Sequence, residues 1–184
     1  MGLQFFKGNK SLKGGACSLS FNSKEGALFV SVIKQTGYDE TRHLGSFSGG
    51  DQTTVKFNVP EIGAFLDVLN NNRDYSTFHK TKEGNTSINF KPYFVMEGDA
   101  KVQKGFGLYI GKLGDDKKVS NSWLMPFNFG EAQVLKSYFD FVLRHIFSAT
   151  YAEDKKKYQD RIDKLQSKKE ITVPPPGEKE QEEI

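Results

Sequence analysis

The sequence has few of the residues that build covalent or metal-dependent sites. Its single cysteine, Cys17, has no second cysteine with which to form an intramolecular disulfide, a usage typical of reducing compartments. Cys17 lies in an alternating apolar stretch, which favours a buried structural thiol over a nucleophile. The three histidines, His43, His79 and His145, are scattered without the paired spacing of zinc ligands. We therefore expect no metal site and no cofactor.

Long apolar runs are also missing, since no stretch approaches the roughly 20 residues that a membrane-spanning helix needs. Residues 1–7 lack the basic region, apolar stretch and cleavage site of a signal peptide, and they lack the Arg and Ser of a transit peptide. We expect a soluble cytoplasmic chain without membrane partners. No Ser/His/Asp order or paired-carboxylate motif stands out, so we expect a protein that is not an enzyme.

Charge is unevenly distributed along the chain. The net charge of the 184 residues is +3, but residues 174–184 carry four glutamates and one lysine, a net charge of −3. The rest of the chain therefore carries +6. A basic body with an acidic end indicates a polyanionic partner.

The chain contains an internal repeat at a separation of about 70 residues. Ser18-Leu19-Ser20-Phe21 matches Ser87-Ile88-Asn89-Phe90 at an offset of 69. Phe57-Asn58-Val59-Pro60-Glu61 matches Phe127-Asn128-Phe129-Gly130-Glu131 at an offset of 70. Two matches in the same order at nearly one offset favour a duplication over chance similarity between Phe-rich strands.

Both halves have the same predicted order of elements. β-branched and aromatic residues alternate in the strand-like segments, and glycine-rich breaks separate them. Pro60 and Glu61 suit the first turn of a helix, and Asn128 suits the N-cap of a second. We predict strands at 15–22, 27–35, 43–48, 53–58, 75–82, 86–95, 105–112 and 119–127, helices at 59–70 and 129–148, and an irregular hairpin at 96–104.

These elements predict an α+β fold of duplicated β-β-β-β-α units, with two antiparallel four-stranded sheets packed with helices. We assign residues 1–150 to one domain with this fold, with repeat one at about 12–72 and repeat two at about 75–148. Alternation gives each strand a second face with Lys, Tyr, Phe, Ser and Asn, which suits a hydrated binding surface.

The order and spacing of several motifs resemble those of the whirly proteins, whose wider fold includes the transcriptional positive cofactor four and trypanosome guide-RNA-binding proteins. Lys7-Gly8-Asn9-Lys10-Ser11-Leu12 is similar to the whirly signature Lys-Gly-Lys-Ala-Ala-Leu, with Asn9 and Ser11 departing from it. Segments 57–69, 75–79 and 126–143 resemble the first helix entry, the strand that follows, and the last strand with its helix. The resemblance covers about residues 5–148.

The resemblance implies a homotetramer with its helices inside and its sheets outside. It also implies that single-stranded DNA lies along the sheets with little sequence preference. Because the sequence shows no transit peptide, we expect a bacterial or phage member, which would act in the host cytoplasm if phage-encoded.

Binding a single strand without sequence preference needs cations for the phosphates and flat rings for the bases, with stacking worth roughly 1–3 kcal/mol per base. Basic residues beside aromatic residues on strands are therefore the candidates, and each has an ordinary alternative, burial for an aromatic ring and a solvated face for a lysine. The candidates are Phe6, Lys7, Lys10, Lys13, Lys34, Lys56, Tyr75, Phe78, His79, Lys80, Lys91, Tyr93, Lys104, Phe106, Tyr109 and Trp123. Phe6, Lys7 and Lys10 rank highest because they lie in or beside the whirly-like signature.

The C-terminal region has two parts. Residues 151–172 alternate basic and acidic side chains around a thin apolar seam, which predicts a charged amphipathic helix docked on the body or paired with another chain. Residues 173–184 contain three consecutive prolines, Pro174 to Pro176, and are expected to form a disordered acidic tail. Its end resembles the tails of bacterial and phage single-strand-binding proteins, which compete with DNA and recruit replication or repair proteins; a solubilising end is the alternative. The candidate partner-binding residues are Glu178, Glu180, Glu182, Glu183 and Ile184.

Three functions remain open at this point. The first is a single-stranded DNA-binding protein that protects or organises DNA in replication, recombination or repair. The second is an RNA-binding or transcription-regulating protein on the same fold, and the third is a structural scaffold without nucleic acid. Affinity for an oligonucleotide and its dependence on salt distinguish them.

Overall fold

A computed structural model of the chain describes residues 2–81, 84–114 and 118–170. The chain forms two units, residues 1–144 and a second unit that begins at His145. The predicted disordered tail at 173–184 lies outside the described residues. Within the described part of the chain, no helix is long and apolar enough to cross a membrane.

The first sheet is antiparallel and has the order β1-β2-β3-β6. Its strands are β1 (Gly2–Lys7), β2 (Gly15–Asn22), β3 (Ala27–Lys34) and β6 (Gln52–Phe57). Alternation sets the two faces, because Cys17 and Leu19 are 1% and 2% exposed while Ser18 and Ser20 lie on the opposite side. We call the side away from the core the outer face.

One predicted strand of this sheet was wrong. Residues 43–48 do not join it, because β5 (Leu44–Ser46) pairs with β4 (Gly37–Asp39) in a separate two-stranded ribbon. The fourth strand of the sheet is instead the N-terminal β1, which pairs with β2, and β6 pairs directly with β3. The ribbon packs on the chain just after β1, where a Cβ on Gly8 would lie 2.8 Å from the nitrogen of Gly45.

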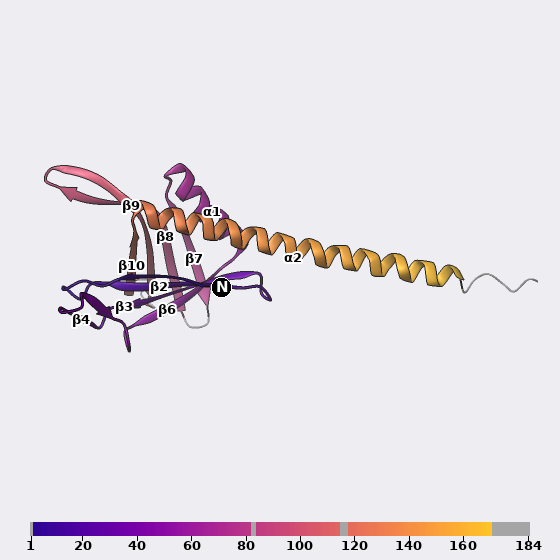
Figure 1. Ribbon diagram of the computed structural model, residues 1–184, viewed down its shortest axis with the longest axis horizontal. Coiled ribbons are helices and arrows are strands. Elements are labelled where there is room, and N and C mark those ends of the chain that lie inside the picture. The colour runs from indigo at the N-terminus through magenta and orange to yellow at the C-terminus, as the bar shows by residue number, and fades with distance from the viewer. Residues whose placement is uncertain (1, 82–83, 115–117, 171–184) are drawn as a thin grey trace, which may run out of the picture. The chain divides into compact units, whose positions relative to one another are not determined.

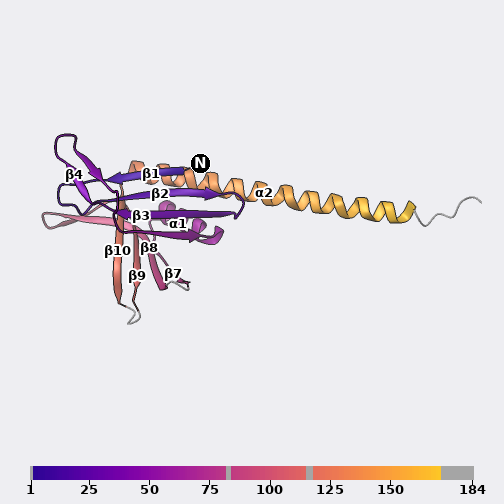
Figure 2. The same ribbon diagram turned by 90° about the horizontal axis from the view of Figure 1, so that it is seen from below.

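The second sheet has the order β10-β9-β8-β7, again antiparallel. Its strands are β7 (Tyr75–Thr81), β8 (Gly84–Glu97), β9 (Ala100–Leu113) and β10 (Val119–Phe127). Figures 1 and 2 show these strands crossing those of the first sheet. The expected irregular hairpin at 96–104 is instead a regular extension of β8 and β9 with a register shift between Tyr93 and Phe94. The α+β fold with two antiparallel four-stranded sheets and helices is confirmed.

Helix α1 (Val59–Asn71) follows the first sheet and α2 (Phe129–Glu170) the second. The two helices predicted at 129–148 and 151–172 form one continuous helix as far as Glu170. In the first unit α2 buries Leu135, Phe139 and Val142, whereas in the second unit Tyr151 is 71% exposed.

A cluster of phenylalanine rings forms the centre of the core. The ring of Phe65, on α1, lies 4.7 Å from that of Phe57, 5.0 Å from that of Phe90 and 5.8 Å from that of Phe139. These rings come from both sheets and both helices. The Phe57, Phe65, Phe90 and Phe139 rings therefore join the two repeats in one core.

The two helices begin with the same capping box, as the repeat predicts. The backbone N–H of Asn58 donates to Glu61 at 2.9 Å and that of Glu61 donates to Asn58 Oδ1 at 3.0 Å. The backbone N–H of Asn128 donates to Glu131 at 2.8 Å, and that of Glu131 donates to Asn128 Oδ1 at 2.9 Å. Each box satisfies donors that a helix N-terminus otherwise leaves without partners.

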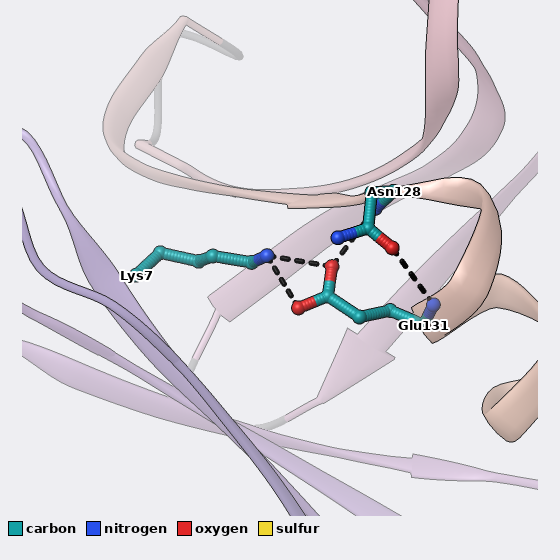
Figure 3. A network of polar contacts seen from close by, with 3 residues as sticks. All are labelled: Lys7, Asn128 and Glu131. Carbon is teal, nitrogen blue, oxygen red and sulfur yellow. Dashed lines mark hydrogen bonds and ion pairs between the residues drawn. The ribbon is translucent and has the colours of Figure 1, made fainter.

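Each capping glutamate also contacts a basic side chain on the first strand of the other repeat. Lys7 Nζ, on β1, lies 2.5 and 2.6 Å from the two carboxylate oxygens of Glu131 on α2 (Figure 3). His79 Nε2, on β7, lies 2.5 Å from Glu61 Oε1 on α1. The capping glutamate of each repeat thus contacts the first strand of the other, so two contacts of the same kind join the repeats.

Candidate nucleic-acid interface

The outer face of the second sheet carries five of the predicted contact residues. Strand register places them on the side away from the helices, since Ile88, Phe90, Leu108 and Ile110 fill the other side. The five are Phe78, Lys80, Lys91, Tyr93 and Tyr109. In the first unit the helices pack on the opposite side, and the lysines on this face are exposed.

Glycines on β9 make room for the two tyrosine rings. A Cβ on Gly111 would lie 3.1 Å from both Cε1 and Oη of Tyr109, so this ring extends along the strand over Gly111. A Cβ on Gly107 would lie 3.5 Å from Cδ2 of Tyr93. Both tyrosines are half-buried. A ring held down over a glycine keeps one face against the sheet and leaves the other available for stacking.

The neighbours of Tyr109 complete a row across the sheet. Asn89 of β8 and Leu124 of β10 are its register partners, and Leu124 is 48% exposed. Phe78 of β7 is 52% exposed and lies opposite Ser87 on the same face. The face therefore carries Leu124 and Tyr109 side by side on β10 and β9, polar side chains at Asn89 and Ser87 on β8, and Phe78 on the β7 edge, with lysines at Lys80 and Lys91.

A groove of about 480 Å³ continues from this face to the end of the first sheet. Four predicted contact residues line it, namely Lys13, Lys34, Tyr93 and Trp123. Lys34 Nζ lies 5.4 Å from the ring centroid of Trp123, and Trp123 Nε1 donates to the backbone oxygen of Asp51 at 2.9 Å. Lys34 thus covers the ring of Trp123 at one wall of the groove, and its ammonium group also lies 4.0 Å from the Asp51 carboxylate.

The loop that follows β1 forms one rim of this groove and is fixed by a buried glutamine. Gln35 is 6% exposed, and its side chain accepts from the N–H of Asn9 at 2.9 Å and donates to the oxygens of Asn9 and Gly37 at 3.0 and 2.7 Å. Lys13 and Lys10 lie in this loop, with Lys10 Nζ 3.8 Å from Glu40. The whirly-like signature therefore lies in a basic loop whose backbone is anchored at Asn9.

The outer face of the first sheet carries a second, smaller aromatic surface. Phe6 is 62% exposed, and its ring centroid lies 5.7 Å from that of Phe47. Lys56 Nζ lies 5.7 Å from the ring centroid of Phe29 and 2.7 Å from Glu25. The two predicted residues here, Phe6 and Lys56, are thus each beside an aromatic ring that the prediction did not include.

Four predicted contact residues point into the molecule rather than toward an open face. Lys7 is engaged by Glu131, and His79 by Glu61. Tyr75 is half-buried, with its ring 5.6 Å from that of Phe65. Phe106 is 6% exposed and packs against Phe90 and Phe129.

Burial makes Phe106 a core residue, so its prediction as a stacking platform was wrong. Trp123 is 5% exposed and covered by Lys34, so the same correction applies to its ring as an open platform. Lys104, the remaining candidate, pairs with Glu97 on the extension of β8 and β9. The five predicted tail residues, Glu178, Glu180, Glu182, Glu183 and Ile184, lie outside the described residues.

The sequence analysis missed several residues of these surfaces. Gly107 and Gly111 alternate with Tyr109 along β9, a spacing that could have indicated rings lying over glycines. Leu124 alternates with buried Trp123 and Met125, so period-two patterning could have placed it on the outer face. Phe47 directly follows β5, and no local pattern indicated its contact with Phe6.

Two groups with shifted pKa values belong to the core. Burial raises the pKa of the Cys17 thiol to about 12. Burial also raises the pKa of Tyr138, partly opposed by a backbone hydrogen bond at Phe21. Among the described residues, no cluster of three His, Cys, Asp or Glu side chains has the geometry to hold a metal ion.

Sequence comparisons find no relatives, since no protein-family model and no curated protein sequence matches the chain. Solved structures do match its fold. WHY3 from Arabidopsis thaliana is 20% identical with a TM-score of 0.58, covering 85% of this chain and 94% of that one. The plant transcriptional regulator PBF-2 is 16% identical with a TM-score of 0.56, covering 84% and 94%.

A third match is a guide-RNA-binding protein complex bound to a guide RNA, 14% identical with a TM-score of 0.58, covering 78% of this chain and 90% of that one. Each match spans most of both chains, so the likeness includes both sheets and the helices. The chain therefore has a whirly-like fold, as its motif order had indicated.

Proposed function

We propose that this protein binds single-stranded nucleic acid on the outer face of its second sheet and in the adjoining groove, with little sequence preference. The observation that carries the proposal is the pair of tyrosine rings held over glycines of β9 on an uncovered face. Stacking on such rings accepts any base, because every base has a π-face.

The charges on this face fit the same ligand. Lys80 on β7 and Lys91 on β8 are exposed on the same face as Tyr93 and Tyr109. Lys13 and Lys34 line the adjoining groove. No acidic side chain lines the groove among the described residues. A backbone can thus follow lysines while its bases lie on Phe78, Tyr109 and Tyr93, which is the general arrangement of proteins that bind single strands.

Single-stranded DNA is the first candidate ligand, and RNA is the second. RNA is a candidate ligand because one solved structure with this fold is a guide-RNA-binding protein complex bound to a guide RNA. The fold likeness to the plant transcriptional regulator PBF-2 supports a transcriptional role as a further candidate. Stacking and phosphate contacts do not by themselves distinguish the two sugars.

We further propose that several copies of the chain, in the first instance four, assemble through the helical side. Phe129 and Val134 at the start of α2 are 53% and 48% exposed, which leaves apolar surface for a second copy. The proposed role is protection or organisation of single strands in replication, recombination or repair in the cytoplasm, as a binding protein rather than an enzyme. The acidic tail is proposed to compete with the nucleic acid or to recruit proteins of those processes.

Fluorescence anisotropy tests the binding. Labelled oligothymidine, an RNA of equal length and a duplex are titrated at fixed salt, and single-stranded DNA is expected to bind best. Affinity should fall with salt at a logarithmic slope of about −0.7 per contacted phosphate. Absence of binding to all three probes at low salt, by protein that is folded by circular dichroism, would leave only a scaffold role.

A matched pair of charge variants locates the site. K80Q/K91Q removes two lysines from the outer face, and K24Q/K155Q removes two exposed lysines elsewhere with the same change in net charge. K80Q/K91Q should weaken binding and should reduce the magnitude of the logarithmic salt slope by more than one contacted phosphate contributes. K24Q/K155Q should change the affinity and the slope very little. Equal effects of the two variants would mean that only net charge matters, against a site on this face.

A further inference from the structure

Strands β8 and β9 continue past both of their neighbours as a two-stranded arm, residues 92–105. β7 begins at Tyr75, opposite Phe90, and β10 ends at Phe127, opposite Phe106, so neither reaches the arm. Figure 1 shows this hairpin extending beyond the other strands. A lone two-stranded hairpin is marginally stable in water, so a long arm of this kind calls for a partner surface.

Backbone geometry and hydrogen bonds fix the orientation of the arm at its base. A register shift between Tyr93 and Phe94 bends the ribbon, and Gly105 has φ 141°, with a Cβ there only 1.9 Å from the oxygen of Phe127. The Gln103 side chain donates to Asn72 Oδ1 at 2.7 Å and to the Gly105 oxygen at 3.1 Å. Bulges that aim a strand are specified features of a fold. The arm is therefore preorganised.

The tip of the arm is apolar and electrically neutral. Phe94, Val95 and Met96 are 41%, 37% and 63% exposed. The charges beyond them cancel, with two acidic residues, Glu97 and Asp99, and two basic residues, Lys101 and Lys104. Lys104 pairs with Glu97, and Lys101 Nζ lies 4.6 Å from the ring centroid of Phe94. Such a surface fits a protein partner better than a polyanion.

The same chain displays a surface that matches this tip. The first four turns of α2 leave Phe129, Val134 and Phe141 exposed by 53%, 48% and 43%. Charges of both signs flank them, with Asp140 and Arg144 exposed on this stretch of helix. Asp140 is complementary to Lys101 of the arm, and Arg144 to its acidic residues. One molecule thus carries both halves of an apolar contact with charges of both signs at its edge.

We propose that the arm of one chain packs on residues 129–144 of α2 in a second copy of the chain. The contact joins two different surfaces, so it is heterologous and closes into a ring when the rotation between copies allows. It rests on the proposed self-association and assigns the surfaces that produce it. The first sheet and the outer face of the second remain open for nucleic acid.

Disulfide trapping between two differently tagged chains tests the contact. One chain carries M96C, the other carries V134C, and the mixture is oxidised and separated on a non-reducing gel. Cys17 is 1% exposed, so the native thiol does not interfere. The matched control replaces V134C by L124C, because Leu124 and Val134 are both 48% exposed and Leu124 lies on the outer face of the second sheet. We expect the mixed disulfide with V134C and not with L124C.

Two variants, F94S/M96S and V134S, complete the test. Self-association and oligonucleotide binding are measured for each. Either variant should lower the association constant measured by sedimentation equilibrium by about tenfold or more, as truncation of interface anchors does. Oligonucleotide affinity per chain should change much less. Unchanged association of both variants together with absence of the mixed disulfide would overturn the arm contact.

The remaining outcomes separate this proposal from the others. A chain that is monomeric at every concentration would overturn the self-association and the arm contact together. Loss of oligonucleotide binding by F94S/M96S with association intact would show the arm to be a nucleic-acid contact and would overturn the proposal in that direction. Absence of nucleic-acid binding by a chain that still forms the mixed disulfide would refute the proposed function and leave the arm contact standing.

Discussion

Replacing Tyr109 with alanine should weaken binding of a single-stranded oligonucleotide without unfolding the protein. The ring is half-buried and rests on Gly111, so one of its faces is open. Loss of one stacked base corresponds to about 1–3 kcal/mol, which is roughly 5- to 150-fold in Kd at 1.4 kcal/mol per tenfold. Y109F keeps the ring and should retain nearly full affinity, while Y151A removes a 71% exposed tyrosine of the second unit and should have no effect.

The glycine beneath the ring gives an independent perturbation. In G111A the new Cβ would lie 3.1 Å from two atoms of the Tyr109 ring and 3.0 Å from Ser87 Oγ, so the ring must shift from its position. We expect weaker binding, although less so than for Y109A. G63A is the matched control, because a Cβ at Gly63 of α1 meets no atom within 4 Å.

Fluorescence anisotropy with labelled oligothymidine measures Kd for all five variants, and thermal unfolding checks that each is folded. An affinity of folded Y109A within twofold of the parent would refute the stacking argument. Equal loss of affinity in G111A and G63A would also refute it, because the effect would then come from substituting any glycine and not from displacing the ring.

Three further predictions concern the core. K7M removes the ion pair to Glu131 and should lower the free energy of unfolding by about 1–3 kcal/mol, which a lower Tm would show. Oligonucleotide affinity per folded chain should remain nearly unchanged. A large loss of affinity at constant Tm would instead show that Lys7 contacts the nucleic acid. Burial raises the pKa of Cys17 from 9.0 to about 12. Between these pH values only the unfolded chain loses the thiol proton, so the free energy of unfolding should fall as pH rises through them. A thiol reagent at pH 8 should modify Cys17 only after denaturation, and rapid modification of the native protein would contradict the burial of this side chain. F65A should cost about 3–5 kcal/mol in urea unfolding, and a loss below 1 kcal/mol would contradict the central position of that ring.

Much of the fold could be predicted from the sequence because its causes are local. Capping residues such as Asn58 and Asn128 mark where the helices begin, and their 70-residue separation exposed the duplication. Alternation placed most strands to within a few residues. The strand at 43–48 was misassigned because its apolar alternation is real, while its partner in the sheet depends on the path of the chain around it.

The candidate site could be predicted only in part, for a reason that lies in strand geometry. Alternation determines that Gly107, Tyr109 and Gly111 share one face of β9 and that Phe106 lies on the other. It does not determine which face meets the helices, because a strand is symmetrical in this respect until something covers one side. Phe106 and Tyr109 therefore looked equivalent in the sequence.

The sequence by itself determined the repeat, the α+β class, the start of both helices and the kinds of residue that a single-strand site needs. The tertiary structure decided which of those residues are available. Packing of the helices on one side of the second sheet buried Phe106 and left the side with Tyr109 uncovered, and the carboxylate of Glu131 engaged Lys7. Each of these outcomes depends on contacts between residues far apart in the chain, and such contacts leave no periodic pattern in the sequence.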